Sequence, residues 1–177
     1  YMPGDFVPHV RMMDEGFSRV ETAKQFGLPY VVIREVRPYD TTTLNYNWQV
    51  WNTQAFSLYT TTTARIEPKG AGQAVLAVMN FLSRQGMIKY SIPEQNEPQV
   101  LKDKEMISVR TAKSGIFEAL VKTGEAVDVG QPLANIMDPY EGENLETLYS
   151  PVQGVVFFQH NEPLTYADTV VIKIVKR

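Results

Sequence analysis

The sequence predicts an α/β sheet layer followed by an all-β domain. Residues 1–90 alternate between apolar strand-like runs and helix-like stretches, which is typical of strands covered by helices. Residues 91–104 are polar and contain two prolines, which favours a linker. Residues 105–177 hold short apolar runs separated by glycines and polar turns, the pattern of a small β-barrel or sandwich.

Local signals place the first elements. Residues 1–10 are rich in Pro and Gly and are expected to form a loop. Ser18 starts an S-x-x-E capping box, which predicts a short helix that Gly27 ends. Residues 30–36 form a β-branched run that is typical of a buried strand.

A second strand and a longer helix are predicted next. Residues 54–59 alternate as a strand does. A helix is expected to begin near Pro68 and to end at Gly86, because apolar side chains recur there at helical spacing. The face expected to pack on the sheet consists of Ala71, Ala74, Val75, Val78 and Leu82.

Residues 44–51 combine amide and aromatic side chains, and no secondary structure is assigned to them. Such a mixture suits the wall of a polar pocket, with Asn45 and Asn47 as candidate ligand-binding residues. The alternative is that Trp48 and Trp51 simply pack and that the asparagines cap turns.

Two similar halves make up residues 114–174. Each half opens at a glycine, Gly115 or Gly154, and passes through a strand and a polar turn before it closes on another strand. The second turn contains Gly130 in one half and Asp168 in the other. This repetition predicts a β-domain with internal two-fold symmetry, whose glycines lie in tight turns or close backbone approaches.

The composition excludes several kinds of site. With no cysteine, the chain can form no disulfide, thiolate zinc site or cysteine nucleophile, which fits a cytoplasmic protein. Only His9 and His160 are present, each expected to be a lone loop or surface histidine, so this chain alone cannot build a histidine-rich zinc site. A net charge of −3 gives no reason to expect nucleic acid, and no apolar run reaches the length of a membrane span.

The β-domain resembles the biotinyl/lipoyl-type barrel, in which G-x-V-x-x-G-x-x-L marks the tight turns. Barrels of that type that carry a cofactor present a Lys on the hairpin between their halves. The corresponding connection here, residues 137–147, contains no Lys. The domain is therefore expected to be an accessory domain, and the reading as a swinging-arm carrier is disfavoured.

Taken together, the segments resemble the C-terminal portion of the succinylglutamate desuccinylase/aspartoacylase family. The matching stretches, in family order, are residues 8–11, 23–29, 43–45, 55–59, 78–88, 115–133 and 150–156. The resemblance implies a zinc-dependent deacylase with a carboxypeptidase-like α/β domain in residues 1–90. It also implies that the zinc ligands lie upstream of the segment matching residues 8–11, so zinc is expected in the intact parent protein and not on this chain alone.

The same resemblance nominates site residues. Tyr59 stands where the family has its general-base Glu, and Asn45 and Asn47 lie on the loop beside the substrate. A tyrosine with an ordinary pKa of about 10 is a poor base at neutral pH, although its phenol can donate a hydrogen bond to an oxyanion. Glu67 is the alternative base, but its position suits a helix start better. Tyr59 and Asn45 are expected to border one cleft.

The expected function is therefore that of the C-terminal portion of a zinc-dependent deacylase, which hydrolyses an N-acyl amino acid or similar small amide through metal-activated water. Its expected partners are that small molecule and the missing N-terminal segment of the same protein, with no nucleic acid and no membrane; a homo-oligomer is left open. The start at Tyr1 can be natural, processed or an internal cut. The alternative is a non-catalytic binding or assembly module.

Overall fold

The computed structural model describes residues 3–14, 17–62 and 65–177. The chain divides into two compact units. The α/β unit consists of Pro8–Thr61 and Glu67–Lys104, and the β unit consists of Tyr1–Val7, Thr62–Ile66 and Glu105–Arg177. No helix in the described ranges has the length and apolar character needed to cross a membrane.

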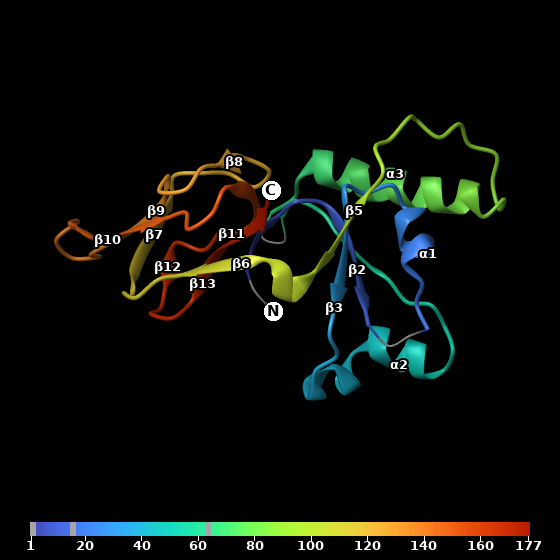
Figure 1. Cartoon of the computed structure of the whole chain (residues 1–177), viewed down its shortest axis with the longest axis horizontal. Helices are drawn as coiled ribbons and strands as arrows, with labels where there is room; N and C mark the ends of the chain where they lie inside the picture. The colour runs from blue at the N-terminus through green and yellow to red at the C-terminus, as the bar shows by residue number, and fades with distance from the viewer. Residues whose placement is uncertain (1–2, 15–16, 63–64) are drawn as a thin grey trace. The chain divides into compact units, whose positions relative to one another are not determined.

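The α/β unit is built on a four-stranded sheet in the order β4-β2-β3-β5, of which β2, β3 and β5 are labelled in Figure 1. Its strands are β2 (His9–Met13), β3 (Tyr30–Arg34), β4 (Ser57–Tyr59) and β5 (Gln99–Lys102). Strands β2, β3 and β5 are parallel, whereas β4 is antiparallel to β2. Strand β5 lies within the stretch expected to be a linker. It was not predicted because only four residues after Pro98 pair with β3, and so short a run carries little periodic signal.

Two helices, α1 (Val20–Lys24) and α3 (Pro68–Arg84), cover one face of this sheet (Figure 1). Ala23 of α1 and Ala77 of α3 share a core with Val10 and Val31 of the strands. Helix α1 lacks the expected capping box. Its N-cap is Arg19, and the Ser18 hydroxyl instead bonds the backbone of Ala55.

Helix α3 begins and ends where predicted but turns a different face to the sheet. Glu67 caps its start by accepting hydrogen bonds from the N–H groups of Lys69 and Gly70. Val75 and Val78, from the face expected to pack on the sheet, are 64% and 42% exposed. The predicted contact of that face with the sheet of this chain is therefore wrong.

The stretch without a predicted structure is helical. The 3-10 helix η1 (Pro38–Thr42) leads into α2 (Leu44–Val50), which lies beyond the carboxyl ends of β2 and β3 in Figure 1. Thr43 joins the two, since its hydroxyl accepts a hydrogen bond from the N–H of Tyr46. The asparagines of this stretch are thus held on a helix.

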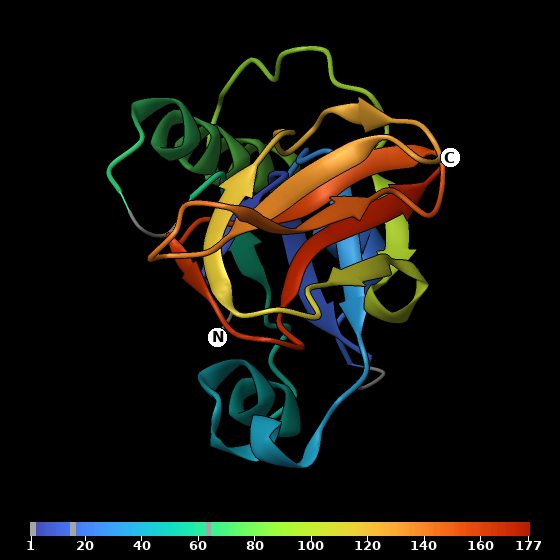
Figure 2. The same cartoon turned by 90° about the vertical axis from the view of Figure 1, so that its left-hand side faces the viewer.

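The β unit contains two sheets, whose strands can be followed in Figure 2. One has the order β1-β11-β13-β6, with β8 also paired to β11, and the other has the order β10-β9-β7-β12. The bounds of these strands are β1 Gly4–Phe6, β6 Ile107–Arg110, β7 Gly115–Ala119, β8 Ala126–Val127, β9 Pro132–Met137, β10 Asn144–Tyr149, β11 Gly154–His160, β12 Leu164–Thr165 and β13 Val170–Lys176.

Both sheets contribute to one core, in which Phe117 and Ile136 pack together with Val156 and Ile174. Neither sheet closes on itself among the described strands, so no barrel is formed there. Of the two expected architectures, barrel or sandwich, two open sheets around one core agree with the sandwich. The N-terminal stretch, expected to be a loop, supplies β1, which pairs with β11. Strand β1 was not predicted because three residues next to Pro and Gly are too few to show the alternating pattern of a strand.

The internal repeat appears in the strand pairing. Within the first half β7 pairs with β9, and within the second half β11 pairs with β13. The short strands are exchanged, because β8 pairs with β11 and β12 pairs with β7. Gly154 lies opposite Val127, and Gly115 lies opposite Thr165. This reciprocal exchange of short strands is the pairing pattern expected of two similar halves.

The glycines of the two halves also have equivalent surroundings. A Cβ on Gly115 would lie 2.4 Å from the carbonyl oxygen of Met137, and one on Gly154 would lie 2.2 Å from that of Val175. In the second turns Gly130 has a φ of 79° and Asp168 a φ of 64°. The prediction of tight turns and close approaches is confirmed at these positions.

Candidate functional site

The two faces of the α/β sheet differ in polarity. Side chains along a strand alternate between faces, and Val10 of β2 belongs to the core beneath α1 and α3. His9 and Arg11 therefore lie on the opposite face. Strand β4 adds two more polar residues there, because Ser57 pairs with Arg11 and Tyr59 pairs with His9.

A cavity of about 130 Å³ lies on this polar face. Its walls come from three strands and from the start of α2, and they consist of Arg11, Met12, Met13, Arg34, Thr43, Asn45, Ser57 and Tyr59. The structure therefore places Tyr59 and Asn45 on one cavity, whereas Asn47 does not line it.

Tyr59 is held by two basic side chains of β2. Its ring stacks on the imidazole of His9, with 4.8 Å between centroids. The guanidinium carbon of Arg11 lies 4.6 Å from the Tyr59 ring centroid, a cation–π geometry, and Arg11 Nη1 donates to the phenol oxygen at 3.5 Å. These contacts orient the phenol at the cavity wall.

The position of Tyr59 departs from the usual location of ligand sites in α/β proteins. Ligand sites in α/β proteins gather at the carboxyl ends of parallel strands, and Tyr59 ends its own strand. Because β4 is antiparallel, Tyr59 lies beside His9, the first residue of β2. It therefore lies toward the amino ends of the parallel strands, and its place at the cavity follows from the shared polar face.

Arg11 supplies the unbalanced charge of the cavity. It is half-buried, its Nε has no hydrogen-bond partner among the described residues, and none of the ion pairs found within them includes it. A guanidinium without a carboxylate partner beside a cavity is suited to bind an anion, and its planar fork matches a carboxylate.

Arg34, the other arginine of the cavity, is neutralised. It pairs with Asp40, whose side chain is 2% exposed and also accepts a hydrogen bond from the N–H of Arg37 at 2.7 Å. Burial alone would raise the pKa of Asp40, but the hydrogen bonds from Arg34 and Arg37 outweigh it and hold the pKa below its ordinary value. The ionised Asp40 thus fixes η1 to the end of β3.

The two candidate asparagines have different roles in the fold. Asn45 Nδ2 donates to Ser57 Oγ at 3.1 Å, and Asn45 Oδ1 accepts from Gln49 Nε2 at 2.7 Å, so its amide is oriented at the cavity. Asn47 Nδ2 donates to the carbonyls of Thr41 and Thr43 at 2.9 and 2.8 Å. Asn47 therefore stabilises the corner between η1 and α2.

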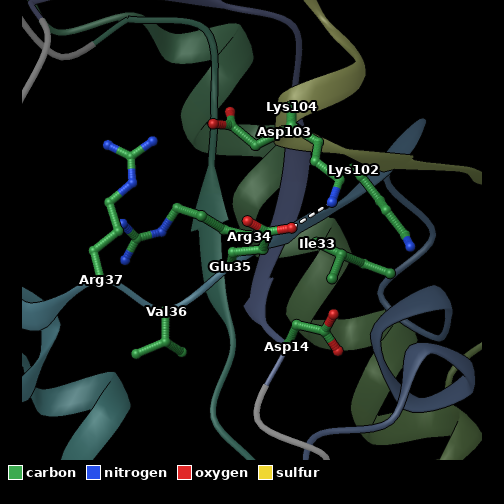
Figure 3. Close-up of a pocket in the computed structure, with 9 residues that line it drawn as sticks. All are labelled: Asp14, Ile33, Arg34, Glu35, Val36, Arg37, Lys102, Asp103 and Lys104. Atoms are coloured by element: carbon green, nitrogen blue, oxygen red, sulfur yellow. Dashed lines mark hydrogen bonds and ion pairs between the residues drawn. The ribbon is translucent and has the colours of Figure 1, made fainter.

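A second cavity, also of about 130 Å³, lies at the carboxyl ends of the parallel strands (Figure 3). Its charged side chains are Asp14, Arg34, Glu35, Arg37, Lys102, Asp103 and Lys104. Glu35 pairs with Lys104 at 2.5 Å, and this hydrogen bond lowers the pKa of Glu35. With Asp40 counted beside Arg34, acidic and basic groups balance there, so the second cavity offers no net charge to a ligand.

Among the residues that the structure describes, metal-binding side chains do not gather at one place. No group of three or more His, Cys, Asp or Glu side chains there could hold a metal ion. His9 is buried in β2, and His160 ends β11 with Nε2 3.2 Å from the carbonyl oxygen of Leu164. Both are buried strand residues and not the loop or surface histidines expected. The residues present do not by themselves fit a zinc site.

The sequence reasoning missed Arg11 as a site residue. Its signal was available, because His9 and Arg11 alternate with Val10 and Met12 in a strand that is otherwise apolar. Polar residues at every second position of a buried strand mark a polar face. The pairing of Arg34 with Asp40 had no comparable signal, since it depends on the turn made by η1.

Comparison with known proteins gives neighbours in structure but none in sequence. No family model and no curated protein matches the chain. A product-bound structure of the ectoine utilization protein EutE (DoeB) from Ruegeria pomeroyi superposes with a TM-score of 0.77 at 19% identity, over 97% of this chain and 54% of that one. A succinylglutamate desuccinylase from a Silicibacter species gives a TM-score of 0.79 at 16% identity with the same coverage.

A succinylglutamate desuccinylase/aspartoacylase from Rhodobacter sphaeroides gives a TM-score of 0.75 at 19% identity, again over 97% of this chain and 54% of that one. At such identities the likeness shows the fold. This chain spans about half the length of these proteins. The resemblance inferred from the sequence is therefore confirmed as a shared fold, that of a portion of the succinylglutamate desuccinylase/aspartoacylase structures.

Proposed function

We propose that this chain is the C-terminal portion of a zinc-dependent deacylase that hydrolyses an N-acyl amino acid or a similar small amide. The observation that carries the proposal is the cavity in which the guanidinium of Arg11, which has no acidic partner among the described residues, lies beside Tyr59 and Asn45. An N-acyl amino acid offers the groups that this set recognises, namely a carboxylate and an amide carbonyl. The shared fold supports the same reading.

Each residue has a defined part in this proposal. Arg11 binds the substrate carboxylate through its guanidinium, and its contact with Tyr59 holds the fork in place. Asn45, oriented by Ser57 and Gln49, donates a hydrogen bond to the bound substrate. The Tyr59 phenol donates to the amide oxygen as negative charge develops on it.

The general base and the zinc ligands come from elsewhere in the proposed enzyme. Glu67, the alternative base, is engaged as the cap of α3. Hydrogen bonds from Thr61 and from the N–H of Gly70 lower its pKa, which leaves it a weaker base. We assign the general base and the zinc ligands to the N-terminal segment of the parent protein, here called the companion segment. Zinc in such an enzyme supplies an activated water.

The test uses the longer polypeptide that contains this chain. It is purified, its zinc content is measured by elemental analysis, and hydrolysis of a panel of N-acyl amino acids is compared with that of their methyl esters. We expect about one zinc per polypeptide and a preference for the free acids, since the ester cannot pair with Arg11. A zinc-loaded polypeptide that hydrolyses none of the panel would contradict the proposal.

Tyr59 also favours a second candidate, a binding module without catalysis. A relative that has lost its general base can retain a carboxylate-binding cavity, and Tyr59 stands at the position of that base in the resemblance. In this case calorimetry would detect binding of an N-acyl amino acid to the longer polypeptide, and no product would form.

A further inference from the structure

Two arginines line the cavity that contains Tyr59 and Asn45, but only one of them has an unbalanced charge. Among the described residues, Arg11 and Arg34 are the charged groups of the lining, and the other lining side chains are neutral. Arg34 is paired with Asp40, whereas none of the ion pairs found among these residues includes Arg11. The cavity therefore offers one positive charge to a ligand, although it contains two guanidinium groups.

Asp40 is fully engaged as the partner of Arg34. Its side chain is 2% exposed, and that of Arg34 is 15% exposed. One carboxylate oxygen of Asp40 accepts a hydrogen bond from Arg34 Nη2, and the other accepts one from the N–H of Arg37. Although burial opposes ionisation, these hydrogen bonds lower the pKa of Asp40, so it is ionised at neutral pH. A second carboxylate brought to Arg34 would lie beside this negative charge and be repelled by it.

No other described side chain of the cavity can take the place of Arg34. Arg37, the next arginine along the chain, donates to the Tyr39 hydroxyl at 2.9 Å and lines the second cavity instead. Met12 and Met13 add apolar atoms to the lining. A charged group that is buried without a partner of opposite charge is strongly disfavoured. A second carboxylate on a ligand would therefore be bound poorly here.

The volume of the cavity also limits the ligand. It measures about 130 Å³, whereas pockets for drug-sized ligands measure about 300–1,000 Å³. Once Arg11 binds the carboxylate of an N-acyl amino acid, the side chain of that amino acid lies close to the same few lining groups. A charge on that side chain therefore meets either neutral groups or the pair of Arg34 and Asp40.

We propose that Asp40 makes this site selective for N-acyl amino acids with an uncharged side chain, because it neutralises the guanidinium that a second carboxylate would need. Asp40 acts on the ligand through Arg34, so it is a positioning residue and not a catalytic one. The class of ligand rests on the proposed function, whereas the charge balance rests on the contacts of this chain alone.

The test compares N-acetylasparagine with N-acetylaspartate, which have nearly the same shape and differ by one negative charge on the side chain. It uses the longer polypeptide, which contains the companion segment. Initial rates give kcat/KM for the two compounds, and titration calorimetry gives Kd if neither is hydrolysed. In the wild type we expect the asparagine derivative to be favoured by about tenfold or more, since one missing charge-assisted hydrogen bond corresponds to about that factor.

Asp40→Asn frees the charge of Arg34 and keeps the size of the side chain. In this variant we expect the preference for N-acetylasparagine to fall by about tenfold or more, through a lower KM or Kd for N-acetylaspartate. The double variant Asp40→Asn/Arg34→Gln lacks both charges and is the control, in which the preference should stay as in the wild type. Circular dichroism checks the fold of each variant, and the wild-type comparison decides the question if Asp40→Asn does not fold.

Equal or tighter binding of N-acetylaspartate by the wild type would overturn the inference. A loss of affinity for both compounds alike in Asp40→Asn would overturn it too, because a purely structural role predicts that result. Preferential hydrolysis of N-acetylaspartate would leave the deacylase in place and overturn only the selectivity. The expected preference in binding without hydrolysis would leave the selectivity in place and count against the deacylase. A polypeptide that neither binds nor hydrolyses the two compounds would contradict both.

Discussion

The ring of Tyr59 lies flat against the imidazole of His9, with 4.8 Å between their centroids and 11° between their planes. The pair occupies the polar face of the sheet, and the guanidinium of Arg11 contacts the same tyrosine ring. Tyr59 therefore makes two separable contributions. Its ring joins the first residue of β2 to the end of β4, and its hydroxyl reaches the cavity.

The substitution Tyr59→Phe separates these contributions, because it keeps the stacked ring and removes the hydroxyl. In the longer polypeptide we expect kcat/KM for an N-acyl amino acid to fall by about 100-fold, the usual effect of losing one donor to a developing oxyanion. The melting temperature should change little. Tyr149→Phe, at an exposed tyrosine of the β unit, is the control. Unchanged kinetics and affinity in Tyr59→Phe would remove any functional role from the hydroxyl.

Arg11→Gln tests recognition of the carboxylate. A hydrogen bond to a charged group contributes about 1.5–3 kcal/mol, so we expect Kd for an N-acyl amino acid to rise by about 10- to 100-fold. Binding of the methyl ester should change much less. Arg65→Gln is the matched control, since Arg65 is 63% exposed and pairs with Asp5 in the β unit. Equal losses for acid and ester would show that Arg11 acts on the fold and not on the carboxylate.

Asn45→Ala and Asn47→Ala should have opposite effects. Asn45 is oriented at the cavity, so its loss is expected to weaken ligand binding by about tenfold with a small change in stability. Asn47 bonds two backbone carbonyls at the η1–α2 corner, so its loss should lower the free energy of unfolding by about 1 kcal/mol and leave binding nearly unchanged. Titration calorimetry and urea unfolding measure the two effects. The reverse pattern would exchange the two assignments.

The sequence predicts the fold where local signals and tertiary contacts agree. The limits of α3 follow from Pro68 and Gly86, and the β repeat follows from glycines that a strand carbonyl approaches. The prediction fails where a strand is too short to show a periodic pattern, or where a residue distant in sequence forms the hydrogen bond that a local motif predicts. Strand β5 has four residues, and Ser18 bonds a distant backbone group instead of capping α1.

The candidate site was only partly predictable for a similar reason. Tyr59 and Asn45 came from a motif resemblance, and their meeting at one cavity depends on the antiparallel course of β4, which no local pattern encodes. The face of α3 shows the same limit. The periodicity of Ala71, Val75 and Val78 predicts an apolar helix face, but it does not identify the surface on which that face packs.

Asp40→Asn should lower stability in a pH-dependent way. The substitution removes one partner of a buried ion pair, and we expect a loss of about 3 kcal/mol at pH 7. The pKa of Asp40 is lowered in the folded state, so its contribution is present above its unfolded pKa of about 3.9 and is lost as the pH falls through the folded value. Urea unfolding should therefore show a difference between wild type and variant that shrinks below about pH 4.

Glu35→Gln is the control for Asp40→Asn, because Glu35 pairs with Lys104 at the surface and its loss should change stability little. A difference between wild type and Asp40→Asn that stays constant down to the acid limit would show that the charge of Asp40 is not what stabilises the η1 corner. The loss would then come from replacing a carboxylate oxygen that accepts a hydrogen bond with an amide NH2 group that cannot accept one.

The internal repeat predicts equal sensitivity at two positions far apart in the sequence. An Ala at Gly154 would place Cβ 2.2 Å from the carbonyl oxygen of Val175, and an Ala at Gly115 would place it 2.4 Å from that of Met137. Either contact forces neighbouring strands apart, so we expect each substitution to cost about 1–3 kcal/mol. Gly72→Ala is the control, since nothing lies within 4 Å of the added carbon and α3 should gain about 0.5–1 kcal/mol. Thermal unfolding of the three variants measures these changes in stability. A large loss of stability in one of the variants Gly115→Ala and Gly154→Ala, with none in the other, would show that the two halves are not equivalent.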